Sequence, residues 1–403
     1  MLEEQDVNRV VLRTLDLMNA QAVKEFRLPP DTYIGAGAIA CIGEALAARG
    51  IRTVFIVIDS LVADLGLAEG MYRSLTHHGV RHREYFQPAG EPHSAFVEEE
   101  VGRFVESGCE GMIALGGGSA IDAAKAIAVL AANPGLAVRD LLDPARIRNR
   151  RLPLIAAPTT AGTGSEATSI TVITDTHSHH KQVIVHPDLT PDLALIDACL
   201  MLPVPPRVTA ATGVDALTHS IEAYVATKAT PLTRALAYQA IRQIGEALPV
   251  AVGRGDDVQA RESMALASYM AGVAFSNAGL GLTHSMAHQI GPRYNLPHGI
   301  ANAILLPSVM RFNQLVRKKD FCDIGLALTG EILSADETVD AVQRLIADVG
   351  LPVNLAEVGG NAEDFAAFAE EALSDYCIAT NPRAVSREQV MAVYSHALHR
   401  KNS

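Results

Sequence analysis

The chain reads Met112-Ile113-Ala114-Leu115-Gly116-Gly117-Gly118-Ser119, a short apolar run that passes directly into three glycines and a serine. The apolar run predicts a buried strand, and the alanine-rich segment 120–132 that follows predicts a helix. Glycines at such a turn let the backbone approach a phosphate group, which the free N–H groups at the helix N-terminus then favour. Because the pattern is not G-x-G-x-x-G, the turn alone does not decide between a phosphate site and an ordinary connection.

Similar apolar runs recur along the first half of the chain, at Val54–Ile58, Leu152–Ala157 and Leu193–Ile196. Segments with helical spacing lie between them, and this alternation predicts an α/β fold with a doubly wound parallel sheet. Beyond the proline-rich run 202–206, the strand pattern fades and helical segments dominate. The helices expected there are Ala211–Ala226, Thr233–Ala247, Arg261–Val273 and Thr338–Val349.

The length of the chain agrees with two domains, because 403 residues exceed the roughly 250–300 at which one core stops growing. We predict an N-terminal helical extension over residues 1–25, an α/β domain over 26–206 and an all-helical domain over 207–403. In the extension, apolar residues between Val7 and Met18 stand at the spacing of an amphipathic helix. That helix either packs on its own domain or docks on a partner, as an encapsulation tag would.

The composition of the chain excludes several classes of protein. Hydrophobic residues make up 49% and charged residues 19%, as in compact globular proteins. The formal net charge of −12 opposes binding to a phosphate backbone, so nucleic acid is not expected as a partner. We expect no membrane span and no signal peptide. The five cysteines are scattered without a C-x-x-C pair, which argues against disulfides and a thiolate zinc site and favours a reducing cytoplasm.

A second polar run, Thr159-Thr160-Ala161-Gly162-Thr163-Gly164-Ser165-Glu166, also follows a predicted buried strand. Ligands of open α/β sheets bind at the carboxyl ends of the strands, so two such loops support each other, although a turn with capping hydroxyls is the alternative. Asp59 ends an earlier strand, where it either caps a helix or accepts a hydrogen bond from a ribose hydroxyl. Its charge would repel the extra phosphate of NADP, so domain 26–206 is expected to bind NAD(H).

Histidines and one aspartate suggest a metal site in the second half of the chain. Asp215 and His219 are four residues apart, which places both on one face of the expected helix. His284, His288 and His298 crowd a mostly apolar stretch, where burying unpaired imidazoles would be costly. One carboxylate with several imidazoles suits Fe(II), Zn(II) or a neighbouring divalent metal.

Other polar residues are interpreted as ordinary surface. His177, His179 and His180 lie in a polar turn, and they are expected to be exposed in the same way as the pair His77-His78. Glu222 shares the helical face of Asp215 and is expected either behind the metal ligands or on the surface.

Taken together, these motifs resemble the iron-containing alcohol dehydrogenase family, and more closely its members associated with ethanolamine utilisation. The resemblance extends from about Phe26 onward and rests on four segments: Gly116–Ser119 with Asp122 and Lys125, Pro158–Glu166, Gly213–Glu222, and Gly281–His288 with Pro297-His298-Gly299. The N-terminal helix is the departure, since only some members of the family carry one. It leaves open whether the protein lies free in the cytoplasm or inside a bacterial microcompartment.

The resemblance implies specific roles for these residues. A single divalent ion, expected to be Fe2+ with Zn2+ and Mn2+ as alternatives, would be held by Asp215, His219, His284 and His298. His288 would lie near the ion as a proton relay or a structural neighbour, and Phe275 and Cys377 match positions that line the substrate pocket. The dinucleotide contacts implied are Asp59, Gly117, Gly118, Ser119, Thr159, Thr160, Thr163, Thr168 and Lys181.

The reaction expected from the resemblance is reversible reduction of a short-chain aldehyde by NADH, with the carbonyl polarised by the metal in a cleft between the domains. A small aldehyde bearing a sulfonate or phosphonate is an alternative substrate, and Arg293 is a candidate to meet that anion. The motifs are also compatible with a zinc-dependent enzyme of the glycerol dehydrogenase type, with three protein ligands, and with a non-catalytic sensor of NAD or metal. A homodimer is expected.

Overall fold

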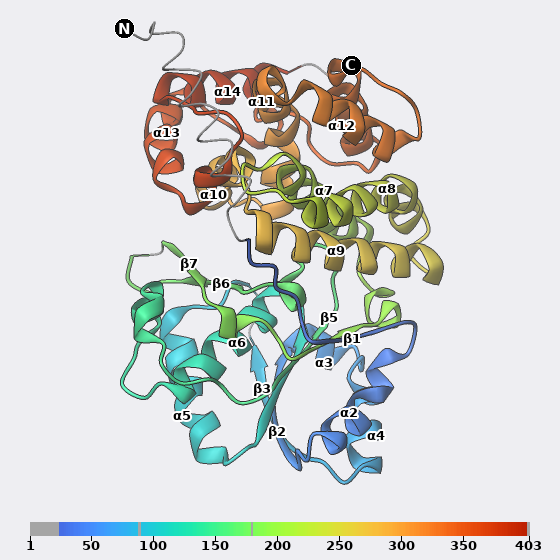
Figure 1. Ribbon diagram of the computed structural model, residues 1–403, viewed down its shortest axis with the longest axis vertical. Helices are drawn as coiled ribbons and strands as arrows, with labels where there is room; N and C mark the ends of the chain where they lie inside the picture. Colours follow the sequence, from blue (N-terminus) through green and yellow to red (C-terminus); the bar gives the residue numbers. More distant parts are fainter. Residues whose placement is uncertain (1–23, 88–89, 179, 401–403) are drawn as a thin grey trace, which may run out of the picture.

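The computed structural model describes residues 24–87, 90–178 and 180–400. Two lobes follow each other along the long axis, an α/β lobe from the first half of the chain and a helical lobe from the second (Figure 1). The helix predicted near residues 7–18 lies outside the described residues, as does the whole of 1–23.

Six parallel strands form the sheet of the α/β lobe, in the order β1-β8-β5-β4-β2-β3. Their bounds are β1 Asp31–Ile34, β2 Thr53–Asp59, β3 Arg81–Gln87, β4 Gly111–Gly116, β5 Leu154–Pro158 and β8 Leu193–Ile196. The helices of this lobe are α2 Ile42–Ala48, α3 Ser60–Asp64, α4 Glu69–His77, α5 Ser94–Ser107 and α6 Gly118–Ala132. An antiparallel hairpin, β6 Ile170–Thr174 and β7 Lys181–Val185, completes the lobe.

The sheet is buried on both faces, which explains why its central strands are continuous apolar runs. In β2, Phe55 and Val57 pack into the core that contains α5 and α6. Their neighbours Val54, Ile56 and Ile58 pack on the opposite face against α2 and α4. The predicted doubly wound parallel sheet is thereby confirmed.

The structure corrects two details of the predicted strands. The strand expected over Leu152–Ala157 begins two residues later, at Leu154, because Pro153 has no N–H to donate to the ladder. The edge strand β3, Arg81–Gln87, was not expected from its sequence. Its first four residues are exposed and ionisable, so no apolar run marks it.

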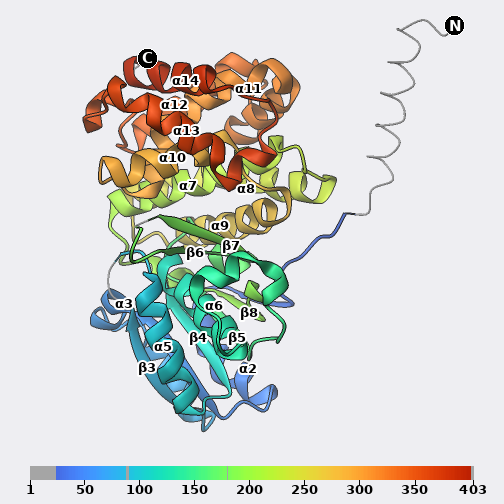
Figure 2. The same ribbon diagram turned by 90° about the vertical axis from the view of Figure 1, so that its left-hand side faces the viewer.

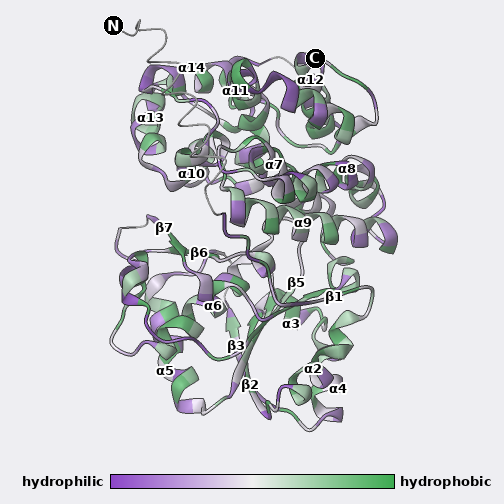
Figure 3. Cartoon of the chain, in the orientation of Figure 1, coloured by the Kyte–Doolittle hydropathy of each residue, from purple (hydrophilic) through white to green (hydrophobic). Residues whose placement is uncertain are grey.

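The helical lobe contains, within the described residues after Ile196, no further strand. Its helices are α7 Pro206–Val225, α8 Pro231–Gly253, α9 Val258–Ala278, α10 Leu282–Arg293, α11 His298–Thr329, α12 Ala335–Asp348, α13 Phe365–Ser374 and α14 Arg387–His399. Outer helices such as α8 and α12 carry both hydrophilic and hydrophobic residues around their circumference (Figure 3). The central helix α7 is buried along nearly its whole length, which places its polar residues inside the molecule.

Short 3-10 segments connect these elements. They are η1 Ala38–Cys41, η2 Val138–Leu142, η3 Pro144–Arg146, η4 Ser165–Ala167, η5 Pro187–Leu189, η6 Ala198–Met201, η7 Ala356–Val358, η8 Ala362–Asp364 and η9 Tyr376–Thr380. By length and hydropathy no single helix of the described ranges could cross a membrane, and one bent pair, α9 with α10, passes that test only when joined.

The carboxyl ends of β4 and β5 meet at the edge of the sheet that faces the helical lobe, with Gly116 paired to Pro158. Figure 2 shows the hairpin β6–β7 directly beneath α9, between the sheet and the remaining helices. The backbone N–H of Ser169, just before β6, donates to Oγ of Ser276 on α9 at 3.1 Å. This edge and the hairpin therefore form one wall of the space between the lobes.

Candidate active site and metal centre

A cavity of about 350 Å³ lies between the two lobes. The start of α6, the loop after β5 and the hairpin β6–β7 line one side of it. Residues of α7, α9, α10, α11 and η9 line the other side. The loops expected to bind a dinucleotide and the residues expected to bind a metal therefore face the same cavity.

The four residues expected to hold a metal ion converge in this cavity from three helices. Oδ1 of Asp215 lies 4.0 Å from Nε2 of His219, 3.9 Å from Nε2 of His284 and 3.6 Å from Nε2 of His298. Ligand atoms of a tetrahedral ion with bonds of about 2.1 Å stand about 3.4 Å apart. The observed distances exceed that value by 0.2 to 0.6 Å, and the ligand atoms of Asp215, His284 and His298 lie within 4.8 Å of one another. These three residues could hold one divalent ion, and His219 lies beside them as the fourth ligand implied by the resemblance.

Helix geometry explains how residues distant in the sequence reach this point. Asp215 and His219 are one turn apart in the buried part of α7. His284 lies in the first turn of α10, and His298 is the first residue of α11. Between these two helices the chain reverses sharply at Asn295, whose φ of 51° is the one positive value of a non-glycine residue among those described. The reversal returns His298 to the face of α10 that carries His284.

The electrostatics of this group fit a cation. Burial raises the pKa of Asp215 and lowers the pKa of His284 and His298 well below the ordinary range. The imidazoles of His284 and His298 are therefore neutral and offer lone pairs, and within the described residues no lysine or arginine forms an ion pair with the carboxylate. A divalent cation would satisfy a carboxylate that is costly to bury alone.

Two hydrogen bonds select the nitrogen that each imidazole presents to this group. Nδ1 of His284 lies 2.6 Å from Oε2 of Glu222, and Nδ1 of His219 lies 3.2 Å from the carbonyl oxygen of Gly162. Because both partners can only accept, each Nδ1 carries the proton and each Nε2 keeps its lone pair. Glu222, for which the sequence left two places open, thus lies behind His284. Gly162 belongs to the Thr159–Glu166 loop, which links the two candidate sites.

A second group of ligand-type atoms lies beside the first. Side-chain atoms of His288, Asp375 and Cys377 lie within 4.8 Å of one another. However, burial raises the pKa of the Cys377 thiol well above its ordinary value, so the sulfur is protonated and a poor ligand. Asp375 is already engaged, since one oxygen faces Nδ1 of His288 at 2.8 Å and the other accepts the N–H of Cys377. We therefore favour the group around Asp215 for the metal.

Five of the residues expected to contact the dinucleotide line the cavity: Gly118, Ser119, Thr163, Thr168 and Lys181. A Cβ on Gly118 would lie 2.7 Å from Cγ2 of Thr163, so any other residue there would require Thr163 to move. Lys181 forms an ion pair with Glu91, so its charge is already balanced.

The other expected contacts lie next to the cavity without lining it. Thr159 donates its N–H to Gly116 at the end of β4, and Thr160 lies beside Gly117. Asp59 caps α3, with Oδ1 accepting the N–H of Leu61 at 2.9 Å. The capping that the sequence allowed for Asp59 is therefore observed, and its second oxygen is not used in that bond.

Two residues of the glycine-rich motif hold the cavity wall together, a role that the sequence did not indicate. Nζ of Lys125 donates to the carbonyl and hydroxyl oxygens of Thr168, at 3.0 and 2.9 Å, and to the carbonyl of Ile170 at 2.7 Å. Burial lowers the pKa of Lys125 to about 8. Asp122 accepts from Oγ of Ser165 at 2.5 Å and from the N–H of Val172 at 2.9 Å. Helix α6 is thereby tied to both the polar loop and the hairpin.

The expected pocket residues both line the cavity. The ring of Phe275 stacks on His219, with centroids 4.4 Å apart, and Cys377 is buried. Arg293, the candidate for a substrate anion, does not line it. Its side chain is 60% exposed and lies 3.0 Å from Asp364. A different cation, Lys228, lines the cavity and has no ion-pair partner within the described ranges.

The other histidine clusters lie away from this cavity. His177 and His180 are exposed, and His179 lies outside the described residues. His77 ends α4, followed by His78.

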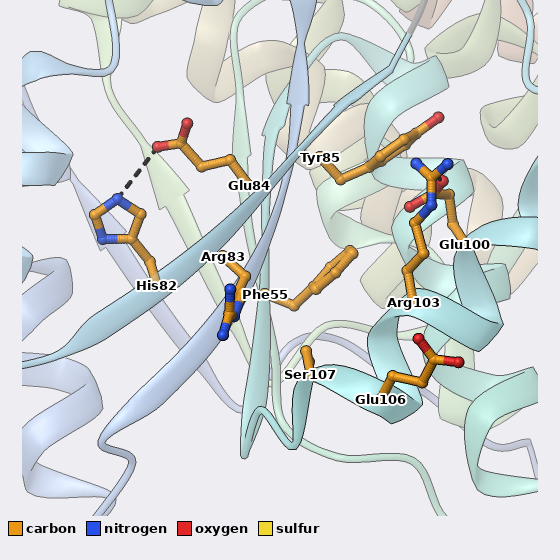
Figure 4. Close-up of a pocket in the computed structure, with 9 residues that line it drawn as sticks. All are labelled: Phe55, His82, Arg83, Glu84, Tyr85, Glu100, Arg103, Glu106 and Ser107. Carbon is orange, nitrogen blue, oxygen red and sulfur yellow. Dashed lines mark ion pairs between the residues drawn. The ribbon is translucent and has the colours of Figure 1, made fainter.

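A larger hollow of about 650 Å³ lies at the edge of the sheet, between β3 and α5 (Figure 4). Phe55 and Tyr85 point into it from the strands, and Arg103 and Glu100 face it from the helix at 2.8 Å from each other. The hydroxyl of Tyr85 and Oε2 of Glu100 have no hydrogen-bond partner among the described residues. The hollow contains neither strand carboxyl ends nor the histidine group, so we do not assign the reaction to it.

Comparison with known proteins covers both halves of the chain. Residues 29–198 match the family described as "Iron-containing alcohol dehydrogenase", and residues 209–398 match "Fe-containing alcohol dehydrogenase family, C-terminal". The chain is 46% identical over 394 residues to "Probable alcohol dehydrogenase EutG" of Escherichia coli strain K12, covering 98% of this chain and 100% of that protein.

Two further similarities agree with that match. The chain is 40% identical to "NAD-dependent methanol dehydrogenase" of Bacillus methanolicus, covering 93% of this chain and 99% of that protein. Its fold matches the crystal structure of 1,3-propanediol oxidoreductase with a TM-score of 0.90 and 36% identity, covering 94% of this chain and 100% of that one. The predicted resemblance and the predicted helical second lobe are confirmed by these comparisons.

Proposed function

This chain belongs to the iron-containing alcohol dehydrogenase family and is an oxidoreductase that acts on alcohols with NAD(H). We propose that it reduces a short neutral aldehyde at an iron(II) centre. One observation carries the proposal. One cavity is lined both by the polar loops of the sheet and by the residues that converge as metal ligands. These ligands are the carboxylate of Asp215 and the imidazoles of His219, His284 and His298.

We assign the metal to these four residues. An ion bound there supplies a Lewis acid for the carbonyl oxygen, and NADH supplies the hydride. The protein contributes neutral imidazoles, a buried carboxylate and, in Glu222, an anion that keeps Nε2 of His284 aimed at the group. Oxygen and nitrogen ligands without thiolate suit iron(II) as well as zinc(II) and manganese(II), and the family supports iron.

Proton transfer is assigned to His288, which lies in the same cavity. Its Nδ1 is held by Asp375 at 2.8 Å. This bond fixes the ring so that Nε2 is the atom free to exchange a proton. Replacing His288 with alanine should lower kcat by about 10²–10⁴-fold and change its pH profile while metal content is kept. Wild-type turnover at every pH would refute the relay.

The dinucleotide is proposed to lie across the ends of β4 and β5, with its phosphates near Gly118 and Ser119. We propose that Asp59 selects NADH over NADPH. One of its oxygens remains for a ribose hydroxyl, and its charge opposes a 2′-phosphate.

The size of the cavity supports a small substrate. A volume of about 350 Å³ stands at the lower end of ligand cavities and must also admit the nicotinamide end of the cofactor. Phe275 and Leu280 give this part of the cavity an apolar lining. We therefore propose an aldehyde of a few carbons, such as acetaldehyde, as the substrate.

An anionic aldehyde is the second candidate substrate, and Lys228 rather than Arg293 favours it. Lys228 is the cation of the cavity that has no ion-pair partner within the described residues, whereas Lys181 is balanced by Glu91. Lys228 could therefore pair with a sulfonate or phosphonate group in the cavity.

The test is a panel of NADH-oxidation rates with neutral and anionic short aldehydes, for enzyme loaded separately with Fe(II), Zn(II) and Mn(II). We expect the largest kcat/KM for a neutral aldehyde with iron. A preference of tenfold or more for the anionic aldehyde, lost in Lys228→Ala, would replace the neutral substrate by the anionic one. Binding of NADH without any aldehyde-dependent oxidation would overturn the proposed reaction and favour a sensor.

We also propose a homodimer in the cytoplasm, including the interior of a microcompartment if the N-terminal segment directs the protein there. This placement rests on the resemblance of the sequence motifs to family members associated with ethanolamine utilisation. Deleting residues 1–20 tests it, because unchanged assembly and location would remove the docking role from that segment.

A further inference from the structure

Asn302 lies against the candidate metal group, although it is not one of the expected ligands. It stands one helical turn after His298 on α11 and is fully buried. Its Nδ2 lies 2.7 Å from Oδ1 of Asp215 and 3.2 Å from Nε2 of both His284 and His298. One amide nitrogen therefore lies against three of the four atoms assigned to the metal.

The orientation of this amide follows from hydrogen-bond chemistry. A carboxylate oxygen can only accept, so the Asn302 atom that faces Asp215 has to be the NH₂ group and not the carbonyl oxygen. Nε2 of His284 is likewise an acceptor, because Glu222 holds the proton of that ring on Nδ1. The single lone pair of Nε2 would go to a bound ion, so the carboxylate of Asp215 is the acceptor that the amide keeps in the metal centre. The reversed amide would place its oxygen against these lone pairs.

Asp215 depends on this contact. It is a buried carboxylate, and among the hydrogen bonds of the described residues Asn302 is its one amide donor. A carboxylate oxygen has lone pairs for more than one partner, so it can accept from Asn302 and still bind a metal ion. Without the amide, the carboxylate could rotate away from the three imidazoles.

We propose that Asn302 is a positioning residue of the metal centre, which holds Oδ1 of Asp215 toward the imidazole nitrogens. The proposal rests on the metal centre assigned under the proposed function. It concerns the affinity and geometry of the ion rather than the steps of the reaction. Outer hydrogen-bond partners of metal ligands typically change metal affinity by about 10–100-fold.

The decisive variant is Asn302→Leu, which keeps the size of the side chain and removes both donors. Binding of Co2+ is measured by chelator competition, and the visible absorption of the bound Co2+ reports its coordination. We expect the Kd for Co2+ to rise at least tenfold and the absorption spectrum to change, with NADH affinity within twofold of wild type. Asn302→Ala, which removes the same donors without adding volume, should show the same two changes if the leucine variant does not fold.

Asn313→Leu is the matched control. Asn313 is also a buried asparagine of α11, but its amide pairs with Asn381 and not with the metal group. It should lose stability while keeping the wild-type Co2+ spectrum. Wild-type affinity and spectrum in both Asn302 variants would overturn the positioning role alone. Failure of the wild-type enzyme to bind Co2+ at all would overturn the assigned metal centre with it.

Discussion

Single hydrogen bonds decide what the imidazoles of this site can do. Glu222 and the carbonyl of Gly162 each hold one Nδ1–H, which leaves Nε2 of His284 and His219 as ligand atoms. Glu222 also accepts the N–H of Thr283 at 2.7 Å and that of Gly281 at 3.0 Å. These two backbone hydrogen bonds fix the position of the carboxylate that binds the imidazole of His284. The carboxylate thus joins the start of α10 to α7.

Glu222→Gln should weaken metal binding. The amide has no negative charge and cannot hold the Nδ1–H of His284 as strongly, so we expect the Kd for Zn2+ to rise about 10–100-fold. Chelator competition measures this constant. Glu246→Gln is the matched control, because that carboxylate is 68% exposed on α8. Equal affinity in wild type and both variants would show that Glu222 has no part in the centre.

Glu166 predicts a pH-dependent difference in stability. Burial raises its pKa to about 7 from an ordinary 4.5. The folded protein therefore keeps a proton that the unfolded chain releases between pH 4.5 and 7, so the acid contributes its stability at low pH and loses it as pH rises through this window.

Glu166→Gln removes this titration. Relative to wild type, the variant should gain stability between pH 5 and pH 8, by up to about 3 kcal/mol at 1.36 kcal/mol for each pKa unit. Thermal melting of both proteins at the two pH values measures the gain, with Glu246→Gln as the exposed control. A difference in Tm that is the same at both pH values would contradict the prediction.

Among the site residues, the sequence predicted those pairs whose members lie one helical turn apart. Asp215 with His219 and His284 with His288 are each one helical turn apart, a relation that can be read along the chain. The bond from Asn302 to Asp215 joins positions 87 apart, as does that from His288 to Asp375. No local pattern marks such pairs, because only the packing of α7, α10, α11 and η9 brings them together.

The polar loop after β5 connects the two lobes at the level of whole elements. Gly164 has a φ of +61°, and a Cβ on it would lie 2.6 Å from Cα of Gly272 on α9. The loop can approach this helix because both residues are glycine. The approach places Thr163 and Gly162 of the same loop at the cavity and at His219, respectively.

Gly164→Ala should push the loop away from α9. We expect a loss of about 1–3 kcal/mol of stability from the clash, and a higher KM for NADH because Thr163 moves with the loop. Urea unfolding and steady-state kinetics measure the two effects.

Gly50→Ala is the control, since Gly50 has a similar φ of +75° but nothing within 4 Å of the added Cβ. It separates backbone strain from the clash and should leave the KM for NADH unchanged. If both variants lose the same stability and neither changes the KM for NADH, the contact between Gly164 and α9 does not position the loop.

Strands that are buried on both faces of the sheet could be predicted from the sequence, whereas the two strands at the edges of the sheet could not. Strands β2, β4 and β8 are apolar on both faces, so their runs are visible in the sequence. β1 and β3 end the sheet, and β6 and β7 form a hairpin outside it. β1 and β3 expose most of their residues, so no buried apolar run marks them and only pairing with their neighbours makes them strands. The segments on either side of the turn with His177 already have strand-like sequences, and they form β6 and β7.

The two lobes of the molecule contribute different groups to the cavity between them. The sheet supplies loops that can carry phosphates, and the helical lobe supplies buried ligands for a cation. Neither set is complete without the other, because the ring of His219 is held by a carbonyl of the α/β lobe. Cofactor and metal are therefore expected to meet only in the cavity between the lobes.

The number of protein ligands distinguishes the proposed iron centre, with four, from a zinc enzyme of the glycerol dehydrogenase type, which would use three. His298 is the discriminating ligand. Its side chain is 31% exposed, more than those of Asp215, His219 and His284.

An anomalous difference map of Co2+-loaded crystals tests directly whether Asp215, His219, His284 and His298 hold one metal ion. We expect one peak, about 2.0–2.2 Å from an oxygen of Asp215 and from Nε2 of His219, His284 and His298. A peak beside His288, Asp375 and Cys377 instead, or one at the predicted group from which His298 stands apart, would contradict this expectation.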